Sequence, residues 1–178
     1  VNSLDGVGGG PSQASGFSSS GLRGGRQKGS KAVAENFSAV ARVDYTGTPG
    51  LMIGTSFYTG DQGHNRELNG REVSIGTNIW EAHLKYQARG FDLQALTALA
   101  SVDNADDLNQ LKGLAGSGSV GEKMTGWYAQ LGYDLLWSSA SEQQLLPYFR
   151  YEAVNTQAEV PSGYSSSGSE DFHVTAIG

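Results

Sequence analysis

The stretch that decides the fold runs from Thr125 to Ala153 and contains two candidate strands around a short polar turn. The first strand reads GWYAQLGYDL (126–135) and the second reads LLPYFRYEA (145–153). Every second residue from Trp127 to Leu135 is apolar, and the residues between them are mostly polar. Because side chains alternate between the two sides of a strand, this pattern predicts one apolar and one polar face.

The same alternation recurs along the chain. Further strands are expected at 37–45, 51–58, 79–89 and 91–100, and a last one begins at Asp171 with Phe172, Val174 and Ala176 on its apolar face. Short turns and long polar connections join these strands in strict alternation, with long connections at 59–78, 103–124 and 154–170. Transmembrane barrels have tight turns at one end and long loops at the other.

Aromatic residues on the apolar faces gather at two levels. The aromatic residues expected near the long connections are Phe37, Phe57, Trp80, Trp127, Tyr151 and Phe172. Those expected near the short turns are Tyr45, Tyr86, Phe91 and Tyr133. Small or aliphatic residues such as Ala82, Leu84 and Leu131 lie between the two levels. Two aromatic belts around an aliphatic band match the two interfaces of a bilayer, whereas a soluble core would have aromatics in its middle.

Composition limits the class of protein. The 178 residues have a net charge of −6, which argues against nucleic-acid binding because that binding depends on basic groups. The absence of Cys excludes disulfides and thiolate metal sites. No run approaches the ~20 apolar residues of a membrane-spanning helix, but a membrane-spanning strand needs only ~9–11 alternating residues.

We therefore expect an all-β fold: an antiparallel, up-and-down transmembrane β-barrel, of which residues 36–178 supply about seven strands. Residues 1–35 are rich in Gly and Ser, and we expect them to form a loop or a disordered segment that buries little apolar surface. Four basic residues between Arg23 and Lys31 fit either a solvated loop or a basic loop beside a pore mouth. Without a signal peptide, and ending within a strand, the sequence is expected to be an internal piece of a longer protein.

The polar faces supply candidates to line a channel. They are Arg42, Asp44, Glu81, His83, Lys85, Gln87, Arg89, Tyr128, Gln130, Asp134, Arg150 and Glu152. Charges in a lumen select the ions that pass, through local potential and hydrogen bonding. In the other interpretation, these charges pair across strands and hold the wall together.

Motifs for catalysis, metals and cofactors are not met. The sequence GSGSVG (116–121) matches a dinucleotide-binding pattern, but no strand of a βαβ unit leads into it. The three histidines lack the spacing of a metal site, and the acidic residues at 103–107 lack the Gly and Glu of a calcium loop. We expect no enzyme activity, no metal and no cofactor.

Three segments resemble the repeated hairpin of the phosphate-selective porin O/P family. They are GWYAQLGY (126–133) with LPYFRYE (146–152), RVDY (42–45) with PGL (49–51), and EAHLKY (81–86) with RG (89–90) and LQAL (93–96). The likeness covers Phe37 to Gly178. It implies a porin of the Gram-negative outer membrane, with about sixteen strands, usually a homotrimer, in contact with the lipid bilayer and lipopolysaccharide.

The resemblance also implies ion transport by passive diffusion. The arginine ladder and lysine cluster that give that family its phosphate selectivity do not map onto this chain. We therefore expect a water-filled channel for small hydrophilic solutes, including anions such as phosphate. Two alternatives remain open: a soluble β-sandwich that binds glycan or protein through its loops, and a plugged outer-membrane barrel that acts as an anchor or adhesin.

Overall fold

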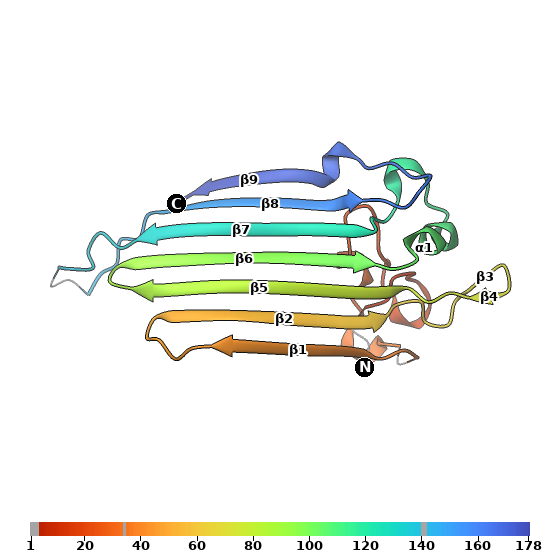
Figure 1. Cartoon of the computed structure of the whole chain (residues 1–178), viewed down its shortest axis with the longest axis horizontal. Coiled ribbons are helices and arrows are strands. Elements are labelled where there is room, and N and C mark those ends of the chain that lie inside the picture. The colour runs from red at the N-terminus through yellow and green to blue at the C-terminus, as the bar shows by residue number, and fades with distance from the viewer. Residues whose placement is uncertain (1–3, 34, 140–141) are drawn as a thin grey trace.

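The fold is a seven-stranded antiparallel sheet with a small layer of loops at one end, which includes a separate two-stranded sheet (Figure 1). A computed structural model describes residues 4–33, 35–139 and 142–178. The strands of the sheet are β1 (Ser38–Tyr45), β2 (Leu51–Asp61), β5 (Gly76–Ala88), β6 (Phe91–Val102), β7 (Lys123–Tyr133), β8 (Tyr148–Glu159) and β9 (Asp171–Ile177). They pair in the order β1-β2-β5-β6-β7-β8-β9. The all-β, up-and-down arrangement is thus confirmed; within the described residues, β1 and β9 remain unpaired edges.

One end of the sheet carries the turns β1–β2, β5–β6 and β7–β8, and we call it the short-turn end. In the β5–β6 turn, Arg89 and Gly90 have φ angles of 53° and 83°. Two-residue hairpin loops of type I′ require positive φ at both positions. We expected Arg89 to extend the strand and face the channel, and this is wrong because the turn needs two residues. The strand ends at Ala88.

The other end, the long-loop end, contains three long connections. The first includes a hairpin of β3 (Glu67–Leu68) and β4 (Arg71–Glu72) around Asn69-Gly70, whose φ angles of 53° and 75° suit a two-residue type I′ turn. The second contains helix α1 (Ala105–Lys112). Among the described residues, none of the helices is long and apolar enough to cross a membrane.

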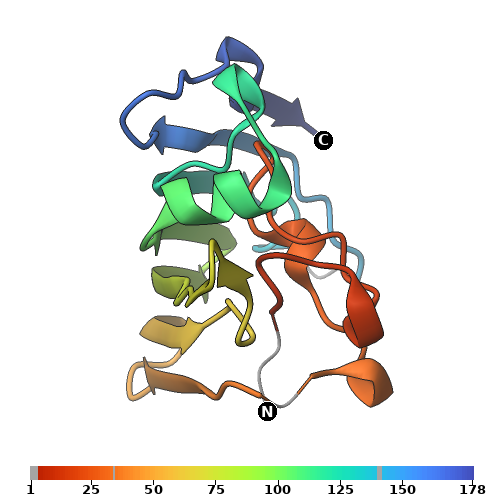
Figure 2. The same ribbon diagram turned by 90° about the vertical axis from the view of Figure 1, so that its right-hand side faces the viewer.

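The glycine-rich residues 4–33, which we call the N-terminal segment, lie beside the sheet at the long-loop end (Figure 2). The N-terminal segment contains three short 3-10 helices, η1 (Gly10–Ser12), η2 (Arg23–Gly25) and η3 (Gly29–Lys31). Its Phe17 is fully buried, although we expected little apolar burial here. A side chain added at Gly25 would come within 2.5 Å of the Phe17 ring. The low side-chain volume of the segment thus allows the chain to wrap closely around one aromatic residue.

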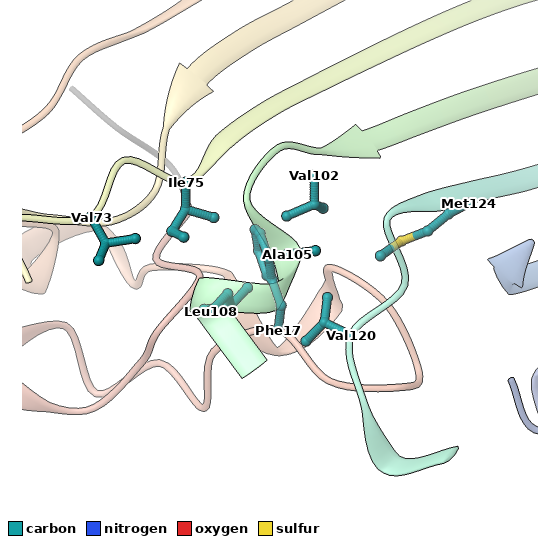
Figure 3. Packing of buried hydrophobic residues seen from close by; sticks show 8 residues of the cluster. All are labelled: Phe17, Val73, Ile75, Val102, Ala105, Leu108, Val120 and Met124. Atoms are coloured by element: carbon teal, nitrogen blue, oxygen red, sulfur yellow. The ribbon is translucent and has the colours of Figure 1, made fainter. Parts of the chain in front are cut away.

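Phe17 belongs to a core that joins the N-terminal segment to the loops (Figure 3). Its buried members are Phe17, Val73, Ile75, Val102, Ala105, Leu108, Val120 and Met124. They come from the N-terminal segment, the connection between β4 and β5, the ends of β6 and β7, α1 and the connection that follows α1. The hydrophobic core of the described chain therefore lies at the long-loop end, not across the broad faces of the sheet.

Strand register determines which residues share a face. Leu84 of β5 pairs with Ala95 of β6, which in turn pairs with Ala129 of β7, so the expected apolar residues do lie side by side. We refer to this surface as the apolar face and to the opposite surface as the polar face.

Strand β9 corrects one assignment. Phe172 pairs with Val154 and Val174 pairs with Glu152, so both lie on the polar face. We expected Phe172 in an aromatic belt on the apolar face, and this is wrong. Both sides of β9 carry apolar residues, so its own alternation does not show which side faces which surface. The register with β8 determines this. His173 takes the position on the apolar face, opposite Ala153.

Candidate functional site

The candidate functional site is the sheet itself, because its two faces differ in chemistry. Large side chains of the apolar face are exposed, from 37% for Tyr133 to 72% for Val43. The set comprises Val43, Tyr45, Ile53, Phe57, Trp80, Phe91, Leu99, Trp127, Leu131, Tyr133 and Phe149. Soluble proteins rarely leave a continuous apolar surface of this extent uncovered. Nothing in the described part of the chain packs over it.

Along the apolar face, the aromatic residues near the long-loop end form a slanting line. Phe57 and Trp80 are direct partners. Trp127 lies one step, or two residues, nearer the short-turn end, in the row of Thr97. Tyr151 lies one step further, opposite Ala129, and its ring is 5.4 Å from that of Trp127. Phe37 precedes β1 and is 76% exposed.

The aromatic residues near the short-turn end slant in the same direction. Tyr45 pairs with Ile53, and Tyr86 lies one step nearer the short-turn end, opposite Leu51. Phe91 and Tyr133 pair one step beyond Tyr86, with ring centroids 4.9 Å apart. Strands tilted relative to a membrane would give belts that cross the strands obliquely in this way.

The two lines keep a constant spacing. Trp80 and Tyr86 of β5 are six residues apart, as are Trp127 and Tyr133 of β7. This interval corresponds to about 20 Å of strand. It is comparable to the ~25 Å apolar band of outer-membrane barrels.

Ten of the twelve expected channel-lining residues lie on the polar face. They are Arg42, Asp44, Glu81, His83, Lys85, Gln87, Tyr128, Gln130, Arg150 and Glu152. Arg89 lies in a turn, as described above. Asp134 follows the last residue of β7, and its Oδ1 accepts hydrogen bonds from the backbone amides of Leu136 and Leu145, both at 3.0 Å. Its carboxylate therefore caps the turn, which corrects its assignment to the channel wall.

A charged cluster spans β1, β2 and β5 on the polar face; we call it the His83 cluster. Asp44 Oδ2 accepts from Arg42 Nε at 2.8 Å, and Asp44 Oδ1 lies 2.9 Å from His83 Nε2. His83 Nδ1 lies 2.7 Å from Glu81 Oε1. Ser56 donates to the other Glu81 oxygen at 2.9 Å. Asp44 reaches His83 across β2 because residue 54 between them is a glycine; a side chain there would come within 2.1 Å of Asp44 Oδ1.

Arg150 forms a second charged group on the same face. Its Nη2 is 2.8 Å from Glu152 Oε2, and its guanidinium lies 3.8 Å from the centre of the Tyr128 ring. The ion pairs of Arg42 and Arg150 thus lie within their own strands and not across strands as that interpretation expected. Across strands, Arg42 contacts His83 and Arg150 contacts the Tyr128 ring. Among the described residues, no ion pair involves Lys85.

Two residues that were not proposed as channel-lining also belong to the polar face. Gln94 pairs with both Lys85 and Gln130, which places these three in one row with Arg150. Asp92 accepts from Gln87 Nε2 at 2.6 Å and from Gln94 Nε2 at 3.0 Å. The alternation of β6 puts both on this face, so the sequence pattern was sufficient to find them.

The N-terminal segment covers the part of the polar face nearest the long-loop end. Thr156 Oγ1 donates to the Ser19 carbonyl at 2.6 Å, and a side chain at Gly21 would contact Thr156 and Met124. Gln62 donates to the Tyr58 hydroxyl at 2.9 Å, and its carbonyl accepts from the amide of Gly6. These contacts attach the segment to β8 and to Gln62, which directly follows β2.

Lys112 at the end of α1 fastens the same segment. Its Nζ donates to the carbonyls of Val7 and Ser15 at 2.8 and 3.0 Å. Burial lowers the pKa of Lys112 below its ordinary value, and the negative charge of Asp5 opposes that shift. The ammonium thus gives up part of its hydration to hold two stretches of the segment together.

Basic residues of the N-terminal segment surround a cavity of about 400 Å³. Arg23, Arg26 and Lys28 line it together with hydroxyl groups, including those of Ser15 and Ser18. The fourth basic residue, Lys31, instead contacts the side-chain oxygen of Gln13.

The part of the chain that the structure describes has no cluster of metal-binding side chains. No group of three or more His, Asp or Glu side chains in that part of the chain could hold an ion. His64 lies in the loop layer, His83 on the polar face and His173 on the apolar face.

Comparison with known proteins gives one relative. An uncharacterized protein of Aquifex aeolicus (strain VF5) is 30% identical to this chain over 159 residues, which cover 86% of the chain. The chain spans 35% of the length of that relative. No family model and no solved structure matches the chain.

Proposed function

We propose that this chain is a wall segment of an outer-membrane β-barrel channel through which small hydrophilic solutes diffuse passively. One observation carries the proposal: the seven-stranded sheet has an uncovered apolar face with two slanting aromatic belts, and an opposite face with charged and amide side chains. Lipid would cover the apolar face, and water would fill the space beside the polar face.

A soluble β-sandwich accounts less well for the same sheet. In a sandwich, the apolar face packs on a second sheet and supplies the core. Here the buried apolar residues of the described chain lie at the long-loop end, while Ile53, Trp127 and Leu131 are 46–49% exposed. The open edges β1 and β9 are consistent with further strands on both sides. The match covers only 35% of a longer relative, which has ample further sequence for such strands.

The charges of the wall are the basis for solute selection in the proposed channel. On the polar face, Lys85 of β5 and Arg150 of β8 lie in one row across the strands. Gln94 of β6 and Gln130 of β7 lie between them. Amides can replace part of the hydration of a solute, while the two cations favour anions. The basic cavity of the N-terminal segment lies at the long-loop end, where it would add positive potential at the mouth. Phosphate is one such anion, and a homotrimer in contact with lipopolysaccharide is the assembly that we propose.

Planar-bilayer recording tests the proposal. The full-length protein is reconstituted into a lipid bilayer, and single-channel currents are measured in KCl. We expect stepwise conductance increases of uniform size. A protein that inserts, as shown by protease protection, but produces no current steps would refute the open channel.

The plugged barrel remains a second candidate because of the N-terminal segment. This segment contacts both β8 and Gln62, which directly follows β2, over the polar face, where it would narrow or close a lumen. A protein that inserts without conducting, and conducts once the segment is removed, would have a plugged lumen.

A further inference from the structure

We infer that His83 makes the ion selectivity of the polar face depend on pH, because its Nε2 exchanges partners between Asp44 and Arg42 when the ring gains or loses a proton. The effect on selectivity rests on the proposed channel function. The exchange of partners concerns the His83 cluster alone and can be measured separately.

The geometry restricts the protonation of the ring. Glu81 Oε1 can only accept a hydrogen bond when ionised, so the 2.7 Å contact requires a proton on His83 Nδ1. His83 Nε2 has two neighbours of opposite kind. Asp44 Oδ1 at 2.9 Å requires a donor, and Arg42 Nη2 at 3.0 Å requires an acceptor. The single Nε2 atom satisfies one of them at a time.

Each protonation state selects one partner. In the imidazolium, Nε2 carries a proton and donates to Asp44, and Arg42 Nη2 loses its acceptor. In the neutral ring, the Nε2 lone pair accepts from Arg42 Nη2, and Asp44 Oδ1 loses its donor. The Arg42 Nε to Asp44 Oδ2 contact at 2.8 Å is compatible with both states. The cluster therefore changes partners without coming apart.

Several strands supply the groups that surround His83. The charged or titratable groups that face it are Arg42 and Asp44 from β1, Glu81 and Lys85 from β5 and Tyr128 from β7. Strands β2 and β6 place Gly54 and Leu96 beside it, neither of which titrates. Side chains of these facing types ordinarily keep their charge between about pH 5 and 8, whereas histidine titrates there.

The exchange changes what the wall presents to ions. At low pH, the cluster gains one positive charge and turns the Nη2 edge of Arg42 toward the lumen. At high pH, it loses that charge and frees one oxygen of Asp44. Selectivity for anions over cations should therefore increase as the pH falls.

Reversal potentials under a KCl gradient measure the selectivity. They are recorded for the full-length protein at about pH 5 and 8, the two ends of the range in which histidine ordinarily titrates. The wild type should shift toward the chloride potential at the lower pH. The variant His83→Gln should lose most of that shift, while His173→Gln, altered on the opposite face, should keep it. An unchanged shift in conducting His83→Gln channels overturns the inference.

Nuclear magnetic resonance tests the partner exchange without any current. The ring nitrogens of His83 and the guanidinium nitrogens of Arg42 are followed during a pH titration of the full-length protein in detergent micelles. The Arg42 signals should move with the same midpoint as the ring signals, and His173→Gln should leave this unchanged. If the Arg42 signals do not change while His83 titrates, the proposed exchange of partners is contradicted. Absence of current with a normal exchange would instead refute the proposed channel alone.

Discussion

At the scale of single residues, Gly54 shapes the polar face through the space that it leaves empty. Asp44 and His83 belong to strands that are not neighbours, since β2 runs between them. Their contact passes directly over residue 54, where a side chain would meet both partners. A three-strand charged cluster therefore depends on one missing side chain.

The substitution Gly54→Ala should separate Asp44 from His83 while the sheet remains intact. The atoms that its Cβ would displace are the ends of flexible side chains, at 2.1 Å from Asp44 Oδ1 and 2.6 Å from the His83 ring. The measurement is the His83 ring nitrogen spectrum at low pH, in which the Asp44-bound Nε2 signal should be lost. Gly126→Ala on the same face is the control, because its nearest neighbour is 3.8 Å away. An unaltered His83 spectrum in Gly54→Ala would contradict the described bridge.

Two alanines of β6 test which face meets lipid. Ala95 lies in the middle of the apolar face between Leu84 and Ala129, and Ala98 lies on the polar face opposite Glu81. An arginine near the middle of the bilayer costs about 2–4 kcal/mol. We therefore expect Ala95→Arg to destabilise the inserted full-length protein by this amount in urea unfolding from lipid vesicles, and Ala98→Arg to have little effect. Equal effects would show that the faces are wrongly assigned.

At the scale of elements, alternation predicted the strands and turns well and the loop layer poorly. Strand β6 begins at the expected Phe91 because period-two patterning and turn residues are local signals. The prediction assigned the two faces of β9 the wrong way round, because the register with β8 determines which side chains lie on which face. Asp134 looked like the next polar residue of a strand, but it caps a turn. Burial of Phe17 was not predictable, because its partners lie between Val73 and Met124 and composition carries no signal for them.

The N-terminal segment should detach when its aromatic anchor is removed. Truncation of a fully buried Phe to Ala costs about 3–5 kcal/mol. In Phe17→Ala, the amides of Asp5, Gly6 and Phe17, which are hydrogen-bonded to the backbone, should exchange faster by hydrogen-exchange mass spectrometry. The exposed Ser20→Ala is the matched control within the segment. Unchanged exchange in Phe17→Ala would contradict the role of this residue as an anchor.

Because of Lys112, the stability of the attached N-terminal segment should depend on pH in the alkaline range. Because its pKa in the folded protein lies below the ordinary 10.5, the folded state binds fewer protons than the unfolded state between these two values. The cost of the buried charge is fully present below the folded pKa and disappears as the pH rises to 10.5. The urea midpoint for release of the segment, followed by the Ala14 methyl signal, should therefore rise in this range.

The non-titrating variant Lys112→Gln separates this effect from other groups. It lacks the ammonium but retains a donor toward the carbonyls of Val7 and Ser15. The difference between wild type and variant should change with pH only in the stated window. A difference that is constant from neutral pH upward would show that burial of the charge has no energetic consequence.

For the molecule as a whole, the sheet and the loop layer contribute different features. Within the described residues, the sheet has unpaired edges at β1 and β9, one exposed apolar face and one polar face. The loop layer holds the hydrophobic core and carries the N-terminal segment over the polar face. In the proposed channel, the sheet determines the wall and the loop layer determines the width at the long-loop end.

Removal of residues 4–33 from the full-length protein should increase single-channel conductance. The deletion takes away the segment that contacts β8 and Gln62, but leaves every strand of the sheet in place. Planar-bilayer recordings of the deleted and parent proteins under identical salt provide the comparison. Phe17→Ala should give an intermediate result, with currents that fluctuate between the two levels. Equal conductance in all three proteins would place the segment outside the ion path.

The pairing of strands only with their sequence neighbours has a consequence for how the molecule assembles. Each pair of adjacent strands in the sheet can form as soon as both strands have been synthesised. The contacts of the N-terminal segment join residues that are far apart in the sequence: Thr156 and Ser19 are separated by 137 residues, and Lys112 and Val7 by 105. Contacts of short sequence separation form much faster than distant ones. We therefore expect the N-terminal segment to dock last, so that the proposed channel would first pass through a wider state in which the segment does not yet cover the polar face.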